Sequence, residues 1–147
     1  MKKVFLHPIL IQFLKELNEK NPRATEFLDL YSNYCGVVDD NVDEAKSADY
    51  IKQMANAATE VYNSSYWKQW GHVLVLLEKI IINQYFDSVK WEKAEEEWKR
   101  QHAKVNSHSA LMMYFAVVLI EYGDKKLEEV SIAWREQAYE MHKEDVI

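Results

Sequence analysis

Residues that make turns are scarce in this chain of 147 residues, which has three glycines and only two prolines, Pro8 and Pro22. Turns and strand connections depend on these residues, so their scarcity indicates few connections and long elements. No Asn-Gly or Asp-Gly pair occurs, and no stretch alternates apolar and polar residues with period two. The sequence therefore predicts an all-α fold.

The chain also has little cysteine, no surplus of basic charge and no long apolar run. Cys35 is the sole cysteine, so the chain cannot form an internal disulfide. Its 18 basic residues face 24 acidic ones and form no basic stripe, which argues against nucleic acid as a partner. The longest apolar run, 110–120, is too short for a bilayer, which needs about 20 residues. The N-terminal apolar run is interrupted by His7, Pro8 and Gln12 and lacks a cleavage site. We therefore expect a soluble cytoplasmic protein that does not bind a membrane.

Apolar residues make up 48% of the chain, and five Trp, nine Tyr and five Phe supply bulky core side chains. This length and content predict a single domain over residues 1–147. Apolar residues recur at steps of three and four, the period of an amphipathic helix. The pattern predicts a bundle of six or seven helices, among them 8–19 with Ile9 inward, 22–45, one capped by Ser47 or Asp49 with Ile51 inward, 66–86, and 126–143.

For two further predicted helices, the sequence also predicts which side chains are buried. Asp87-Ser88 is read as a restart, after which Trp91, Ala94, Trp98 and Val105 form the buried seam of a peripheral helix. The helix at 110–122, which Gly123 is expected to end, is apolar on nearly every side, and such a helix is typical of the centre of a bundle. We expect Phe115 and Val118 on that helix to be fully buried.

The most informative stretch is the acidic end of the helix at 22–45. Asp39 and Asp43 lie one turn apart there, and Asp40 precedes Glu44 by four residues, so the carboxylates share about one turn. Like charges at these spacings repel unless a cation neutralises them, and carboxylate oxygens suit Mg²⁺. The same pattern also fits a solvated helix end with no ligand. Gly36, inside this helix, costs about 1 kcal/mol against Ala and favours a close approach by another helix or a ligand.

Residues 31–44 read Tyr-x-x-Tyr-Cys-x-x-Val-Asp-Asp-x-Val-Asp-Glu. This pattern resembles the first aspartate-rich motif of the squalene and phytoene synthase branch of class I isoprenoid synthases. The resemblance implies an all-α protein in which Asp39, Asp40 and Asp43 hold Mg²⁺ against a prenyl diphosphate, with Glu44 as an outer partner. Gly36 stands where that family usually has arginine, and no second aspartate-rich motif follows.

For the remaining candidate residues, three histidines and the cysteine, we expect structural roles. His72, His102 and His108 share no helix face in a His-x-x-x-His or Glu-x-x-His pattern, so we expect surface histidines. Cys35 lies on the apolar side of its helix and is expected to be a buried thiol. No catalytic residue is identified, and whether the chain is an enzyme stays open.

Two functions follow from these observations. The first is a small helical protein that binds a protein or a small ligand without catalysis, of the kind that viruses and mobile elements encode. The second is a reduced isoprenoid-synthase-like protein that binds Mg²⁺ and a diphosphate through Asp39, Asp40 and Asp43.

Overall fold

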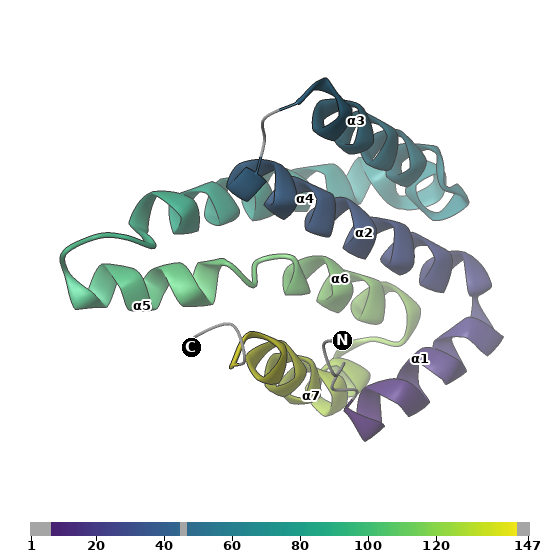
Figure 1. Ribbon diagram of the computed structural model, residues 1–147. Helices are drawn as coiled ribbons and strands as arrows, with labels where there is room; N and C mark the ends of the chain where they lie inside the picture. The colour runs from purple at the N-terminus through teal and green to yellow at the C-terminus, as the bar shows by residue number, and fades with distance from the viewer. Residues whose placement is uncertain (1–6, 45–46, 144–147) are drawn as a thin grey trace. The chain divides into compact units, whose positions relative to one another are not determined.

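The computed structural model describes residues 7–44 and 47–143, apart from the side chains of residues 44 and 141–143. Within these residues the chain forms helices and no strand, so the all-α prediction is confirmed there. The helices are α1 (Pro8–Lys20), α2 (Pro22–Glu44), α3 (Ala48–Asn63), α4 (Ser65–Trp91), α5 (Glu97–Asn106), α6 (Leu111–Glu121) and α7 (Asp124–Lys143) (Figure 1).

Contacts divide the chain into two compact units. One unit consists of the chain up to Glu16 together with everything from Leu76 onward, and the other is Leu17–Val75. Helices α1 and α4 each run through both units. The prediction of a single domain stays a prediction.

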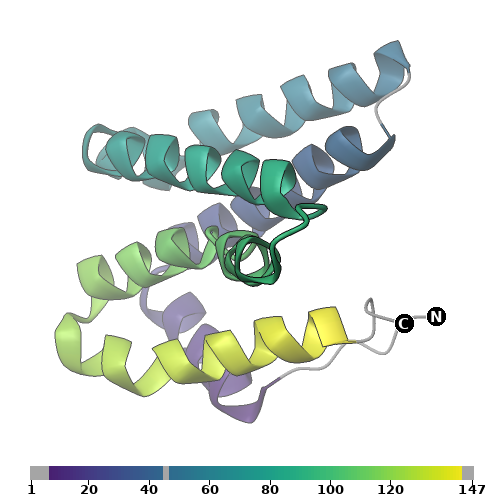
Figure 2. The same ribbon diagram turned by 90° about the vertical axis from the view of Figure 1, so that its left-hand side faces the viewer.

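The unit Leu17–Val75 is built around Phe27 of α2. Its ring stacks on Tyr66 and Trp67 of α4 at centroid distances of 5.4 and 6.2 Å, and on Tyr31 one turn along α2. Helices α2 and α3 pack side by side (Figures 1 and 2). Pro22 occupies the first position of α2, where its missing N–H costs no hydrogen bond, so this predicted boundary is confirmed.

The other unit is built around Trp134 of α7. The Trp134 ring stacks on Tyr114 at 5.3 Å and meets Phe13 of α1 edge-on at 5.6 Å. Helices α6 and α7 form a hairpin, seen in Figure 2 in light green and yellow. Gly123 lies between them with φ of 90°, a conformation that L side chains rarely adopt, so the predicted glycine stop is confirmed.

His7 ties the start of α1 to α7 within the same unit. Its main-chain N–H donates to Oε1 of Gln137, and its ring Nε2 lies 2.9 Å from Oε2 of Glu136. The other ring nitrogen, Nδ1, accepts the N–H of Ile9 at 3.2 Å, so Nε2 carries the proton that Glu136 accepts. No sequence pattern predicted this histidine cap.

The predicted restart at Asp87-Ser88 is wrong, because α4 continues to Trp91. Ser88 is buried, and its hydroxyl donates to the carbonyl of Tyr85 inside the helix. The break falls instead between Trp91 and Glu97. There, Nη1 of Arg100 donates to the carbonyls of Ala94 and Glu95, each at 2.6 Å. This guanidinium satisfies two carbonyls that no longer belong to a helix.

Several predicted inward positions prove to be exposed or half-buried. Ile9 and Ile51 are exposed, and Leu10 is buried in α1 instead of Ile9. On α6 Val118 is fully buried as predicted, but Phe115 is only half-buried. The central position of α6 therefore stays a prediction. The Phe115 ring meets the buried Trp134 edge-on at 6.1 Å, and its other ring contact among the described residues is the exposed Arg135, whose guanidinium lies 5.3 Å from the ring centroid.

Among the described residues, no single helix has both the length and the apolar content to cross a membrane. Helices α5 and α6, bent by 41° where they meet, pass that test only when taken together.

Candidate functional site

The acidic stretch of α2 points its carboxylates outward. Asp39, Asp40 and Asp43 are all exposed, while Asn41 among them is buried. Nδ2 of Asn41 donates to the carbonyl of Val37 at 2.9 Å and to the carbonyl of Tyr50 in α3 at 3.2 Å. Among the described side chains of this stretch, the polar one that packs inward is thus an amide that joins two helices.

No group of three or more His, Cys, Asp or Glu side chains among the described residues is placed to hold a metal ion. The side chain of Glu44, the predicted outer partner, lies outside the described residues. A Cβ atom added to Gly36 would meet nothing within 4 Å, so no other helix approaches closely there. The role of Asp39, Asp40 and Asp43 in binding Mg²⁺ stays a prediction.

The predictions that the three histidines lie on the surface and that the Cys35 thiol is buried are confirmed only in part. His72 and His102 are exposed, as expected, and His108 is half-buried near the start of α6. Cys35 was expected to be buried but is half-buried, although it follows the buried Tyr31 by four residues on the same side of α2.

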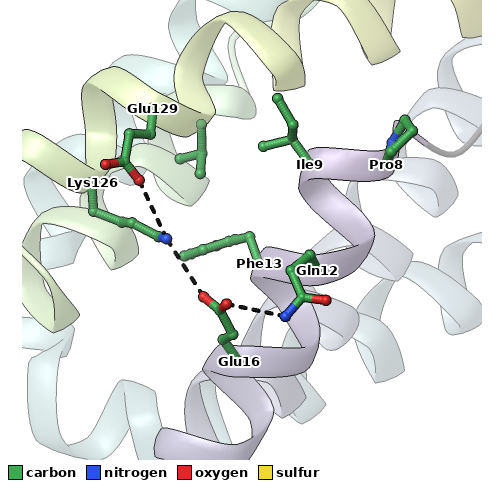
Figure 3. A pocket seen from close by; sticks show the side chains of 8 residues that line it. Pro8, Ile9, Gln12, Phe13, Glu16, Lys126 and Glu129 are labelled. Carbon is green, nitrogen blue, oxygen red and sulfur yellow. Dashed lines mark hydrogen bonds and ion pairs between the residues drawn. The ribbon is translucent and has the colours of Figure 1, made fainter.

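A pocket of about 310 Å³ lies between α1 and α7 (Figure 3). Apolar side chains of both helices line one side of it, and Gln12, Glu16, Lys126 and Glu129 line the other. The Lys126 ammonium reaches across the pocket to within 3.5 Å of Glu16 Oε2 and 3.4 Å of Glu129 Oε2. It also lies 5.8 Å from the centroid of the Phe13 ring. The polar groups of this pocket therefore bind one another and hold α1 against α7.

The charges in this pocket shift each other's ionisation. The hydrogen bond from Gln12 and then the charge of Lys126 lower the pKa of Glu16 below its ordinary value. Burial alone would lower the pKa of Lys126, but the hydrogen bond to Glu129 and the charge of Glu16 outweigh it and raise that pKa. Burial, followed by the charge of Glu16, raises the pKa of Tyr122. Glu16 and Lys126 therefore stay oppositely charged around neutral pH.

An aromatic corner stands at the junction of α4 and α5. The rings of Trp91 and Trp98 meet edge-on at 5.4 Å, and Lys99 Nζ lies 5.8 and 5.6 Å from their centroids. Lys99 also pairs with Glu96 at 3.2 Å. Trp98, predicted to be buried, is 54% exposed, and Val105 on the same helix is exposed too. The buried-seam prediction for this helix is therefore wrong, because α5 buries Ala103 on the opposite side.

In the second half of α4, several apolar side chains are exposed and an acidic side chain is buried. This is the reverse of what these residue types favour. Leu76 is 69% exposed and Ile80 is 51% exposed, while Glu78 between them is only 4% exposed. Ile82 and Phe86 are exposed as well. Single exposed apolar residues are ordinary, but a group of them on one helix beside a buried acid is informative. We call Leu76, Ile80, Ile82 and Phe86 the α4 face.

No protein-family model, curated protein or solved structure matches this chain.

The α4 face was missed by the sequence analysis although a signal for it existed. The residues Leu74, Glu78 and Ile81 follow steps of four and three, and all are buried. Leu77, which is half-buried, also fits steps of three and four between Leu74 and Ile81, and an acid is rarely chosen as a core residue. Taking Glu78 as inward would have left Leu76 and Ile80 on the outside.

Proposed function

We propose that this chain is a non-catalytic binding protein and that the α4 face docks a helix of a partner protein. The observation that supports this is the reversed burial of α4, where Leu76 and Ile80 are exposed and Glu78 is buried. Contiguous exposed apolar side chains are typical of surfaces that a partner covers.

A helix is the occupant that suits this face. Leu76 and Ile80 are four residues apart, as are Ile82 and Phe86, so α4 carries two short apolar rows that lie on either side of Lys79 and Lys90. Rows of this kind pack against the ridges of another helix, and an amphipathic helix laid in an apolar groove is a common recognition mode. The partner helix would cover the apolar side chains that α4 leaves in water.

The other surfaces are less suited to a partner. The pocket between α1 and α7 is crossed by Lys126, which pairs with carboxylates from both helices. The aromatic corner of α5 is covered by Lys99 of the same chain. On the α4 face the Phe86 ring meets Tyr85 edge-on at 5.5 Å, but no lysine or arginine of the described residues lies over it.

A displayed library of helical peptides tests the proposal. Each peptide fixes an apolar stripe and varies all other positions. We expect selected peptides to lose affinity about tenfold or more for Ile80→Ser, as removal of a central interface residue does. Ile132→Ser is the matched control, because Ile132 is a 64% exposed isoleucine on α7. It should bind as wild type does, and circular dichroism should show the same helix content in all variants.

Three results would count against this assignment. If no peptide is enriched, or if Ile80→Ser and Ile132→Ser bind equally, the α4 face is not a docking site. If Trp98→Ser abolishes binding instead, the docking surface lies on α5. If wild type self-associates in sedimentation and Ile80→Ser does not, the occupant is a second copy of the chain.

A further inference from the structure

We infer that the helix recognised by the α4 face is acidic and presents two carboxylates about three helical turns apart, one to Lys79 and one to Lys90. This inference rests on the proposed function, because it concerns the partner of the same surface.

Lys79 and Lys90 are exposed lysines placed among the apolar residues of α4. Lys79 follows Leu76 by three residues and Lys90 follows Phe86 by four, so each neighbours an exposed apolar side chain on the helix surface. None of the ion pairs among the described residues involves either lysine.

Two other lysines of this chain form ion pairs within it. Lys99 pairs with Glu96, and Lys126 pairs with Glu16 and Glu129. The chain has a net charge of −6, so carboxylates are plentiful. Lys93 and Lys104 are also exposed and in no ion pair among the described residues, so Lys79 and Lys90 are distinguished by their place beside exposed apolar side chains.

Neither acid of α4 forms an ion pair with these lysines. Glu78 is turned to the buried side of the helix, and Asp87 accepts a hydrogen bond from Nδ2 of Asn83 at 3.2 Å. Complementary charge around an apolar contact selects partners and orients them, while like charge rejects them. Lys79 and Lys90 thus favour an acidic helix and reject a basic one.

The spacing of the two lysines defines the partner further. They are eleven residues apart, which is about three turns and about 16 Å along the helix axis. Both therefore point to the same side of α4. A partner helix that runs alongside needs its two carboxylates at a similar spacing, ten to twelve residues apart by the same geometry. Its apolar stripe then lies over Leu76, Ile80 and Phe86.

The peptide library tests this inference separately from the docking itself. Among peptides that lose affinity for Ile80→Ser, we expect Asp and Glu to be enriched in pairs ten to twelve positions apart. Lys79→Glu with Lys90→Glu should weaken these peptides about tenfold, and changing the paired acids of the peptide to lysine should restore binding. Raising the salt concentration should weaken the wild-type complex.

The matched control is Lys93→Glu with Lys104→Glu. These two lysines are exposed and also eleven residues apart, so the control changes the net charge equally but away from the α4 face. It should leave binding unchanged. If the selected peptides engage Ile80 but show no acidic pairs, or if both double variants weaken them equally, the inference is wrong and the docking site stands. If no peptide engages α4, the docking site and the inference both fail.

Discussion

A Cβ atom placed on Gly71 would lie 2.8 Å from Nε1 of Trp67, which is four residues earlier in α4. The indole cannot move away easily, because its ring meets Tyr62 edge-on at 5.0 Å and stacks on Phe27 at 6.2 Å. A side chain at position 71 would therefore push against a packed aromatic cluster. The glycine is required by this contact and not by the backbone of α4.

Gly71→Ala and Gly36→Ala form a matched pair of substitutions in helix interiors. Alanine is preferred over glycine in a helix by about 1 kcal/mol, so both substitutions share that gain. At Gly36 nothing lies within 4 Å, and we expect stabilisation by about 0.4–1 kcal/mol. At Gly71 overpacking of about 1–3 kcal/mol should cancel or exceed the gain. Urea unfolding measures both, and equal stabilisation of the two variants would contradict the Trp67 contact.

Asn41→Ala tests the amide that joins α2 to α3. The substitution removes the donor to the carbonyls of Val37 and Tyr50 and leaves a small cavity. We expect the free energy of unfolding to fall by about 1–3 kcal/mol. Asn33→Ala in the same helix is the control, because Asn33 is exposed and such substitutions usually stay within about 0.5 kcal/mol. Similar losses in the two variants would show that Asn41 does not hold α3.

Glu16→Gln tests the ion pair that crosses the pocket between α1 and α7. The pKa of Glu16 is lowered in the folded protein, so its charge stabilises the fold above the unfolded pKa, near 4.5. That stabilisation is lost as the pH falls through the lower, folded pKa. We therefore expect Glu16→Gln to have a lower Tm than wild type at pH 7, with the difference shrinking toward pH 3. Thermal unfolding across this range checks it.

The control for that experiment is Glu19→Gln, an exposed glutamate later in α1 that takes part in no ion pair among the described residues. Its Tm difference from wild type should be small at pH 7. A Glu16→Gln difference that stays constant down to pH 3 would mean that the carboxylate charge is not what stabilises the pocket.

Calorimetric titration with Mg²⁺ and pyrophosphate tests the acidic stretch of α2. Asp39, Asp40 and Asp43 are exposed on the helix, so we expect no heat beyond that of Na⁺ at matched ionic strength. Asp39→Asn with Asp43→Asn should raise stability slightly, by about 0.2–0.5 kcal/mol, because like charges one turn apart repel. A saturable heat that this double variant abolishes would instead support a metal–diphosphate site.

The helix boundaries show most clearly what could be predicted from the sequence. Pro22 begins α2 and Gly123 separates α6 from α7, both as predicted, because these residues act through their own backbone geometry. The helix break predicted at Asp87-Ser88 is wrong, because α4 continues through these residues. Ser88 can also donate to a carbonyl within a helix, and the actual break is stabilised by Arg100, which is several residues away.

By itself, the sequence determined that this chain is helical and where most helices begin and end, since those properties depend on neighbours within about one turn. Only the tertiary structure decided which sides of the helices are covered. Helix α4 has apolar residues on several sides, so its period does not distinguish Leu77 from Glu78 as the inward residue. Packing against segments distant in the sequence settled that choice, burying Glu78 and leaving Leu76, Ile80 and the two neighbouring lysines on the outside.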